Sequence, residues 1–204
     1  ADQLQPAVQA AGVSASHYGY RQRSLVAMLA AFQQDRAAVI AQCDAAIREM
    51  TAFGEAYDHP WVMSDLSTAL LRVREPERAA TIATRAIDVA VRHVLPWEEA
   101  RASLRLSLCV EGPQSAAALE RALALTNEYG FDDLWIRRER RDSAACLAHA
   151  IAEEIGPGDM ALRLAIASGS EVTEEVVNIL APAPQAIRVR VAEALGDAGT
   201  GAEV

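Results

Sequence analysis

The sequence predicts an all-α protein organised as an α-solenoid of antiparallel helix pairs. Pro60-Trp61 recurs 36 residues later as Pro96-Trp97, and helix-like sequence follows each pair. An internal repeat of this length is typical of stacked helix pairs. The composition agrees, because 51% of the residues are hydrophobic, only 5% are aromatic, and the abundant Ala has the highest helix propensity. No stretch alternates at a period of two residues, so strands are not expected.

Local signals place each helix in turn. Asp35 is a candidate N-cap, and Gly54 and Gly130 follow helical stretches as stop signals. Pro60 and Pro96 stand near first turns, where the missing N–H costs little. In chain order, the expected helices cover residues 2–11, 17–33, 35–53, 60–73, 75–94, 96–110, 114–129, 132–155, 159–167, 173–180 and 185–195.

Residues three and four positions apart lie on the same face of a helix, so the spacing of the apolar residues indicates the apolar face of each helix. In the helix 17–33, the members of one face are Leu25, Met28, Leu29 and Phe32. In the helix 35–53, the expected buried stripe is Val39, Ile40, Cys43, Ala46, Ile47 and Met50. In the helix 75–94, the inward residues are Ala79, Ala83, Ala86, Ile87 and Ala90.

The helix pairs resemble tetratricopeptide repeats. In that family a small residue of the second helix is followed four residues later by an apolar residue and three residues after that by Ala. Three segments carry the pattern: Ala79, Ala83 and Ala86; Ser115, Leu119 and Ala122; and, more loosely, Val39, Cys43 and Ala46. The first helices depart from the family, because they lack its Trp-Leu-Gly-Tyr signature and the repeat length drifts from 36 to about 40 residues.

Two further resemblances concern the second half. The phrase RALALTNEYGF at 121–131 is similar to the MalT-like repeats of large bacterial signalling and transcription regulators, and 186–199 resembles the second helix of a HEAT repeat. They imply a right-handed solenoid, with tetratricopeptide-like repeats over 1–156 and HEAT-like helices over 157–204. They also imply a cytoplasmic regulatory module. Because the chain lacks a starting Met, we expect it to be a segment of a longer polypeptide.

The charge argues against two classes of partner. The formal net charge of −9 disfavours direct nucleic-acid binding and binding to an anionic membrane surface. No apolar run approaches the length of a membrane span. One basic run has two interpretations: a solvated helix face paired with nearby acidic residues, or a site for an anionic partner. It consists of Arg137, Arg138, Arg140 and Arg141.

No catalytic, cofactor-binding or metal-binding set is evident, so we expect neither an enzyme nor a cofactor. Three cysteines stand far apart within apolar helical patterns, which indicates buried free thiols rather than disulfides. The histidines lack metal-ligand spacing, and His59 and His93 are expected to be solvated or capping residues. Cys146 and His149 share a helix face, which leaves a Cys–His site geometrically conceivable.

The predicted function is a non-catalytic protein-interaction or regulatory module that binds a protein, a peptide or another domain of its own chain. Self-association through the solenoid ends is a further expectation. The alternative is a small-molecule sensor domain of such a regulator. Trp61 and Trp97 either form an exposed aromatic pair or are equivalent packing residues. The possible groove contacts are Arg21, Trp61, Ser64, Asp65, Thr68, Trp97, Arg101, Ser103 and Arg105.

Overall fold

The computed structural model describes residues 18–54, 58–168, 178–189 and 191, and within them every regular element is helical. The elements are α2 (Gly19–Phe32), α3 (Arg36–Phe53), α4 (His59–Arg72), α5 (Pro76–Arg92), α6 (Pro96–Cys109), α7 (Gly112–Tyr129), the π-helix η1 (Leu134–Arg138), α8 (Arg140–Ala152) and α9 (Met160–Ala167). The predicted helix class is therefore confirmed. The chain divides into two compact units, Ala1–Arg105 and Leu106–Val204.

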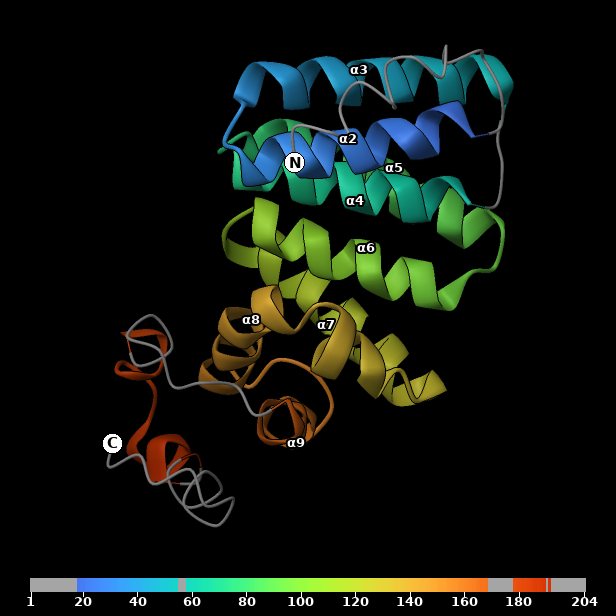
Figure 1. The fold of residues 1–204 in the computed structure, drawn as a ribbon. Helices are drawn as coiled ribbons and strands as arrows, with labels where there is room; N and C mark the ends of the chain where they lie inside the picture. Colours follow the sequence, from blue (N-terminus) through green and yellow to red (C-terminus); the bar gives the residue numbers. More distant parts are fainter. Residues whose placement is uncertain (1–17, 55–57, 169–177, 190, 192–204) are drawn as a thin grey trace. The chain divides into compact units, whose positions relative to one another are not determined.

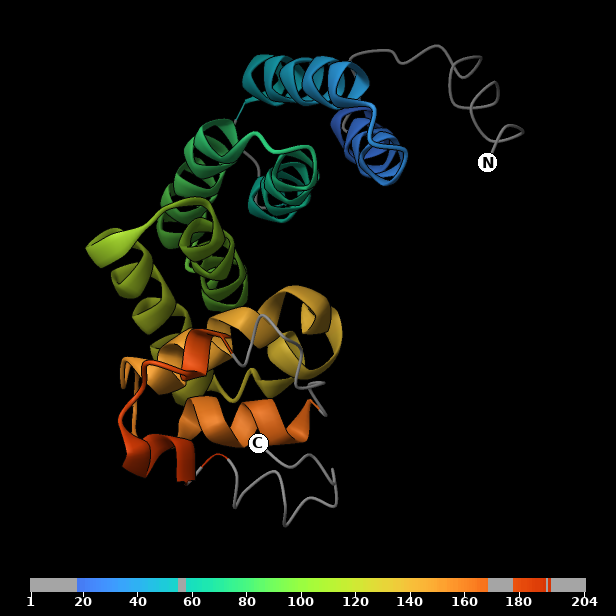
Figure 2. The same cartoon turned by 90° about the vertical axis from the view of Figure 1, so that its left-hand side faces the viewer.

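In the first unit, consecutive helices pack as antiparallel pairs, α2 with α3 and α4 with α5, and α2 also packs against α4 (Figures 1 and 2). Polar bonds connect α3 to α5 along their length. The bonded pairs are Arg36 with Glu75, Arg78 with Asp44, and Arg85 with Thr51. The partners stand 34 to 39 residues apart, so corresponding helices of successive pairs face each other at close to the sequence repeat.

The helix ends follow the predicted capping signals. The Asp35 carboxylate accepts a hydrogen bond from the Ala38 backbone N–H at 3.0 Å, which confirms it as the N-cap of α3. Gly54 ends α3 with φ of 93°, and Gly130 ends α7 in the left-handed conformation with φ of 73°. Pro60 lies in the first turn of α4. These residues therefore fix where α3 and α4 begin and where α3 and α7 end.

The core of the first unit is built from small and medium side chains. The buried stripes of α3 and α5 agree with the predicted ones, except that Ile40, Ile47 and Ile87 are only half-buried. Their fully buried members, with the α4 residues that complete the core, are Val39, Cys43, Ala46, Met50, Met63, Leu66, Leu70, Ala79, Ala83, Ala86 and Ala90. The alanines allow close helix approach, since they add almost no side-chain bulk.

The apolar residues that were expected to share one face of α2 do so, but that face points outward. Leu25 and Phe32 are each 64% exposed and Leu29 is 49% exposed. The face that packs inside the unit instead carries Ser24 with Tyr20, Ala27, Ala30 and Ala31. The helix is thus apolar on two opposite sides: alanines and Tyr20 lie on the buried side, and leucines and Phe32 lie on the solvent side.

In the second unit, the expected long helix over 132–155 is interrupted, so that part of the prediction was wrong. Residues 134–138 form the π-helix η1, in which the Glu139 N–H bonds to the Leu134 carbonyl five residues earlier, at 2.9 Å. Trp135 is fully buried there, and its Nε1–H donates to Thr126 Oγ1 of α7 at 2.8 Å. The wider turn accommodates this bond, and α8 begins afresh at Arg140.

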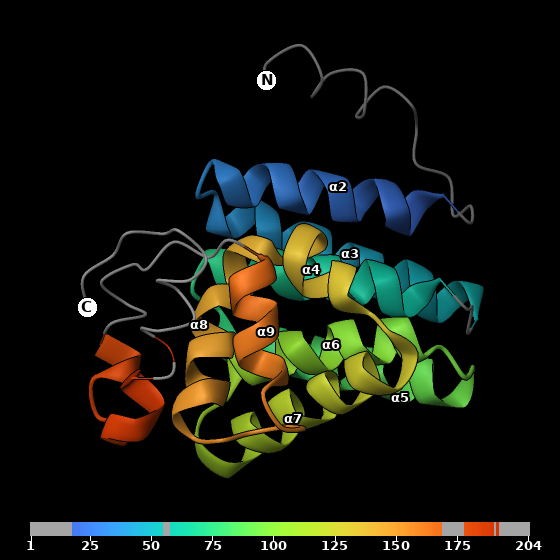
Figure 3. The ribbon, with the colours of Figure 1, turned by 90° about the horizontal axis from the view of Figure 1, so that it is seen from below.

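The described C-terminal residues complete the second unit. Segments 178–180 and 185–189 are helical (Figure 3). Ala183, Ile187 and Val191 pack against Ile151 and Ala152 of α8 and Leu162 of α9. The expected helix 2–11, most of the expected helix 173–180, and most of the HEAT-like stretch lie outside the described residues. The predicted boundary at 156–157 falls in the loop between α8 and α9, which pack together.

Candidate functional site

Four of the predicted contact residues, which come from α2, α4 and α6, lie close together in the first unit. The Arg21 guanidinium carbon of α2 lies 5.7 Å from the centroid of the Trp61 ring of α4. From α6, Arg101 donates from Nη1 to the Trp61 carbonyl at 3.3 Å and forms an ion pair with Asp65. We call Arg21, Trp61, Asp65 and Arg101 the Trp61 cluster.

Asp58 balances the charge on the α2 side of the Trp61 cluster. Its carboxylate accepts from Arg21 Nε at 2.7 Å and from the Tyr20 hydroxyl at 3.0 Å to each oxygen. Asp58 is buried, so these bonds offset the cost of removing its charge from water. Sequence reasoning missed Tyr20 and Asp58, because 55–60 reads as a linking segment. The signal was an Asp directly before a His-Pro helix start.

Exposure differs sharply among the predicted contacts. Trp61 is 39% exposed, whereas Arg21 and Trp97 are half-buried. The contacts buried within the fold are Ser64, Thr68, Arg101, Ser103 and Arg105. Ser64 donates to the Pro60 carbonyl and Thr68 to the Ser64 carbonyl, each at 2.9 Å. These buried residues contribute to helix packing. Of the remaining predicted contacts, Trp61 is exposed, and Arg21, Asp65 and Trp97 are half-buried.

His59 differs from its prediction. It is buried at the start of α4, and its ring meets the Tyr20 ring edge-on at a centroid distance of 5.0 Å. The expectation that this side chain is solvated was therefore wrong. His93 is exposed at the C-terminal end of α5, as expected. Within the described residues, no group of three or more His, Cys, Asp or Glu could hold a metal ion.

The cysteines are free thiols; Cys43 and Cys146 are buried and Cys109 is half-buried. Burial raises the pKa of the Cys43 thiol to about 12, with a smaller contribution from the nearby Asp44 carboxylate. A thiol protonated at neutral pH is a poor nucleophile. Cys146 Sγ lies 3.9 Å from Ser107 Oγ. The buried positions of Cys43 and Cys146 are those of side chains that pack in the core.

The basic run after α7 lies next to acidic side chains. Arg137 Nε is 3.4 Å from an Asp133 oxygen, and Arg138 Nε is 4.0 Å from a Glu139 oxygen. The Arg137–Asp133 pair is largely exposed, and such pairs contribute little to stability. The geometry favours the solvated-face interpretation for these two residues.

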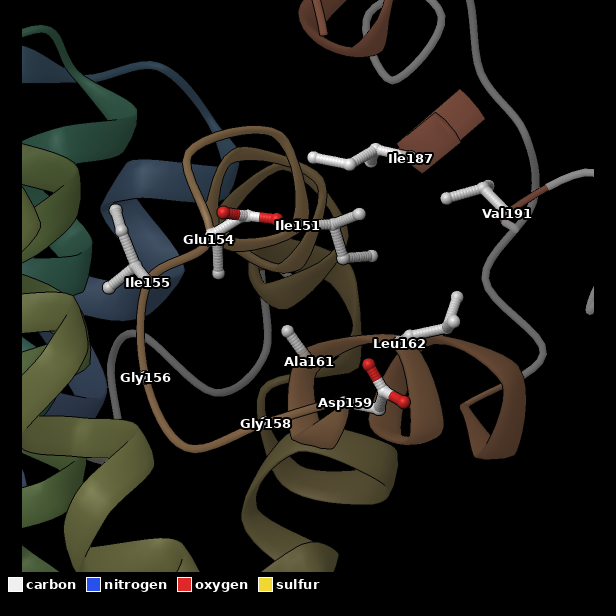
Figure 4. A pocket seen from close by; sticks show the side chains of 11 residues that line it. Ile151, Glu154, Ile155, Gly156, Gly158, Asp159, Ala161, Leu162, Ile187 and Val191 are labelled. Atoms are coloured by element: carbon white, nitrogen blue, oxygen red, sulfur yellow. The ribbon is translucent and has the colours of Figure 1, made fainter. Parts of the chain in front are cut away.

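A hollow in the second unit is the second candidate site (Figure 4). Its volume is about 240 Å³, below the range of roughly 300–1,000 Å³ typical of ligand pockets. Its walls combine apolar side chains with polar atoms, and its two acidic residues, Glu154 and Asp159, are exposed. The lining residues are Ala150, Ile151, Glu154, Ile155, Gly156, Gly158, Asp159, Ala161, Leu162, Ile187 and Val191. Only a small molecule or a single side chain would fit.

Comparison with known proteins yields no match: no family model, no curated protein and no solved structure resembles the chain significantly. The tetratricopeptide, MalT-like and HEAT resemblances therefore rest on the residues given above. Among the described helices, none combines the length and apolar character needed to cross a membrane.

Proposed function

We propose that this chain is a non-catalytic α-solenoid module that binds a protein or peptide, as part of a cytoplasmic bacterial signalling or transcriptional regulator. The repeat supports the solenoid, because α3 and α5 carry polar bonds between positions about one repeat apart. In such folds the concave surface that stacked pairs create is commonly the binding surface.

The observation that carries the proposal is the exposed Trp61 held in a fixed frame. Arg21 lies against its ring, and Arg101, itself buried and paired with Asp65, bonds to its carbonyl. A tryptophan with a restrained backbone and a partly exposed ring loses little conformational entropy on binding. Trp and Arg are also the residues most enriched in binding hot spots. Because Arg21 and Arg101 are each paired with a carboxylate, we expect a partner to recognise Trp61 mainly through apolar and stacking contacts.

The test compares Trp61→Ala with a matched control, Val91→Ala. Val91 is also an exposed apolar residue, on α5 of the same unit. After a partner is identified by affinity capture and purified, its affinity is measured by calorimetry. Loss of a hot-spot residue costs about 2 kcal/mol or more, a rise in Kd of roughly 30-fold. Equal affinities for wild type and Trp61→Ala would refute this site.

The hollow in the second unit favours a second candidate, a small-molecule sensor. Ligand binding to the native state alone raises stability, by about 2.7 kcal/mol at 100 times the Kd. A thermal-shift screen of small metabolites, with Leu162→Trp designed to fill the hollow, tests this candidate. A rise in melting temperature that Leu162→Trp abolishes would support the sensor, and no rise across the panel would remove it.

A further inference from the structure

We draw no further inference here: the strongest candidate, the hollow lined by α8, α9 and Ile187 in the second unit, belongs to the site already described, and its exposed carboxylates, Glu154 and Asp159, form an acidic pair for which no second observation within the described residues indicates a ligand.

Discussion

Removing the Asp65 carboxylate tests whether the Trp61 cluster is built on a buried charge. The Arg101 side chain is 5% exposed and that of Asp65 is 21% exposed, so their ion pair is largely shielded from water. The Arg78–Asp44 pair is a natural control, because the same two residue types meet between neighbouring helix pairs at 42% and 45% exposure.

The expected magnitudes follow from that difference in burial. Removing one partner of a buried ion pair destabilises by about 3–5 kcal/mol, because the other charge stays in a low-dielectric environment. Asp65 retains some contact with water, so we expect Asp65→Ala to lower the free energy of unfolding by about 2–3 kcal/mol. Asp44→Ala should lower it by no more than about 0.5 kcal/mol, since exposed pairs are worth little.

Urea denaturation followed by far-UV circular dichroism measures both values. With an m of about 2 kcal/mol/M, Asp65→Ala should move the midpoint by about 1–1.5 M, whereas Asp44→Ala should move it by about 0.25 M or less. If Asp65→Ala is no more destabilising than Asp44→Ala, the buried-charge account of the cluster is incorrect.

Three further experiments have defined outcomes. Gly156 has φ of 91°, and an added Cβ would lie 2.8 Å from Leu123 Cδ1, so Gly156→Ala should cost about 2–3 kcal/mol by chemical denaturation. Gly54→Ala, with φ of 93° and open space around the new Cβ, should cost only about 1 kcal/mol, and equal costs would contradict the packing argument. Iodoacetamide at neutral pH should label Cys109 well before Cys43, as mass spectrometry of digests can check. Because burial raises the folded pKa of Cys43 above the ordinary 9.0, its contribution to stability is present below pH 9 and lost as pH rises toward about 12. Stability over that interval should fall less steeply in Cys43→Ala than in wild type, and identical slopes would refute this assignment.

Much of the fold could be predicted because local signals and burial agreed. Asp35, Gly54 and Gly130 act on the backbone beside them, so their effect does not depend on distant residues. The Ala79 stripe was equally predictable, since small side chains at helical spacing have few roles other than close packing.

The remaining differences arise where tertiary contacts decide. In α2, both faces are apolar, so periodicity identified a face without indicating which one is buried. In 132–155, the bond from Trp135 to Thr126 requires a wider turn. This contact joins two helices, and a local sequence pattern does not predict such a contact. The Trp61 cluster was partly predicted, but Arg101 and Ser103 are polar residues used in packing, which sequence polarity alone assigns to a surface.

Hydrogen–deuterium exchange of the chain with its captured, purified partner tests the central claim most directly. If the chain is an interaction module acting through the Trp61 cluster, binding should protect peptides covering 19–25 and 58–66, and Trp61→Ala should abolish that protection. Protection confined to 150–162, around the hollow of the second unit, or the same protection in Trp61→Ala, would contradict the account.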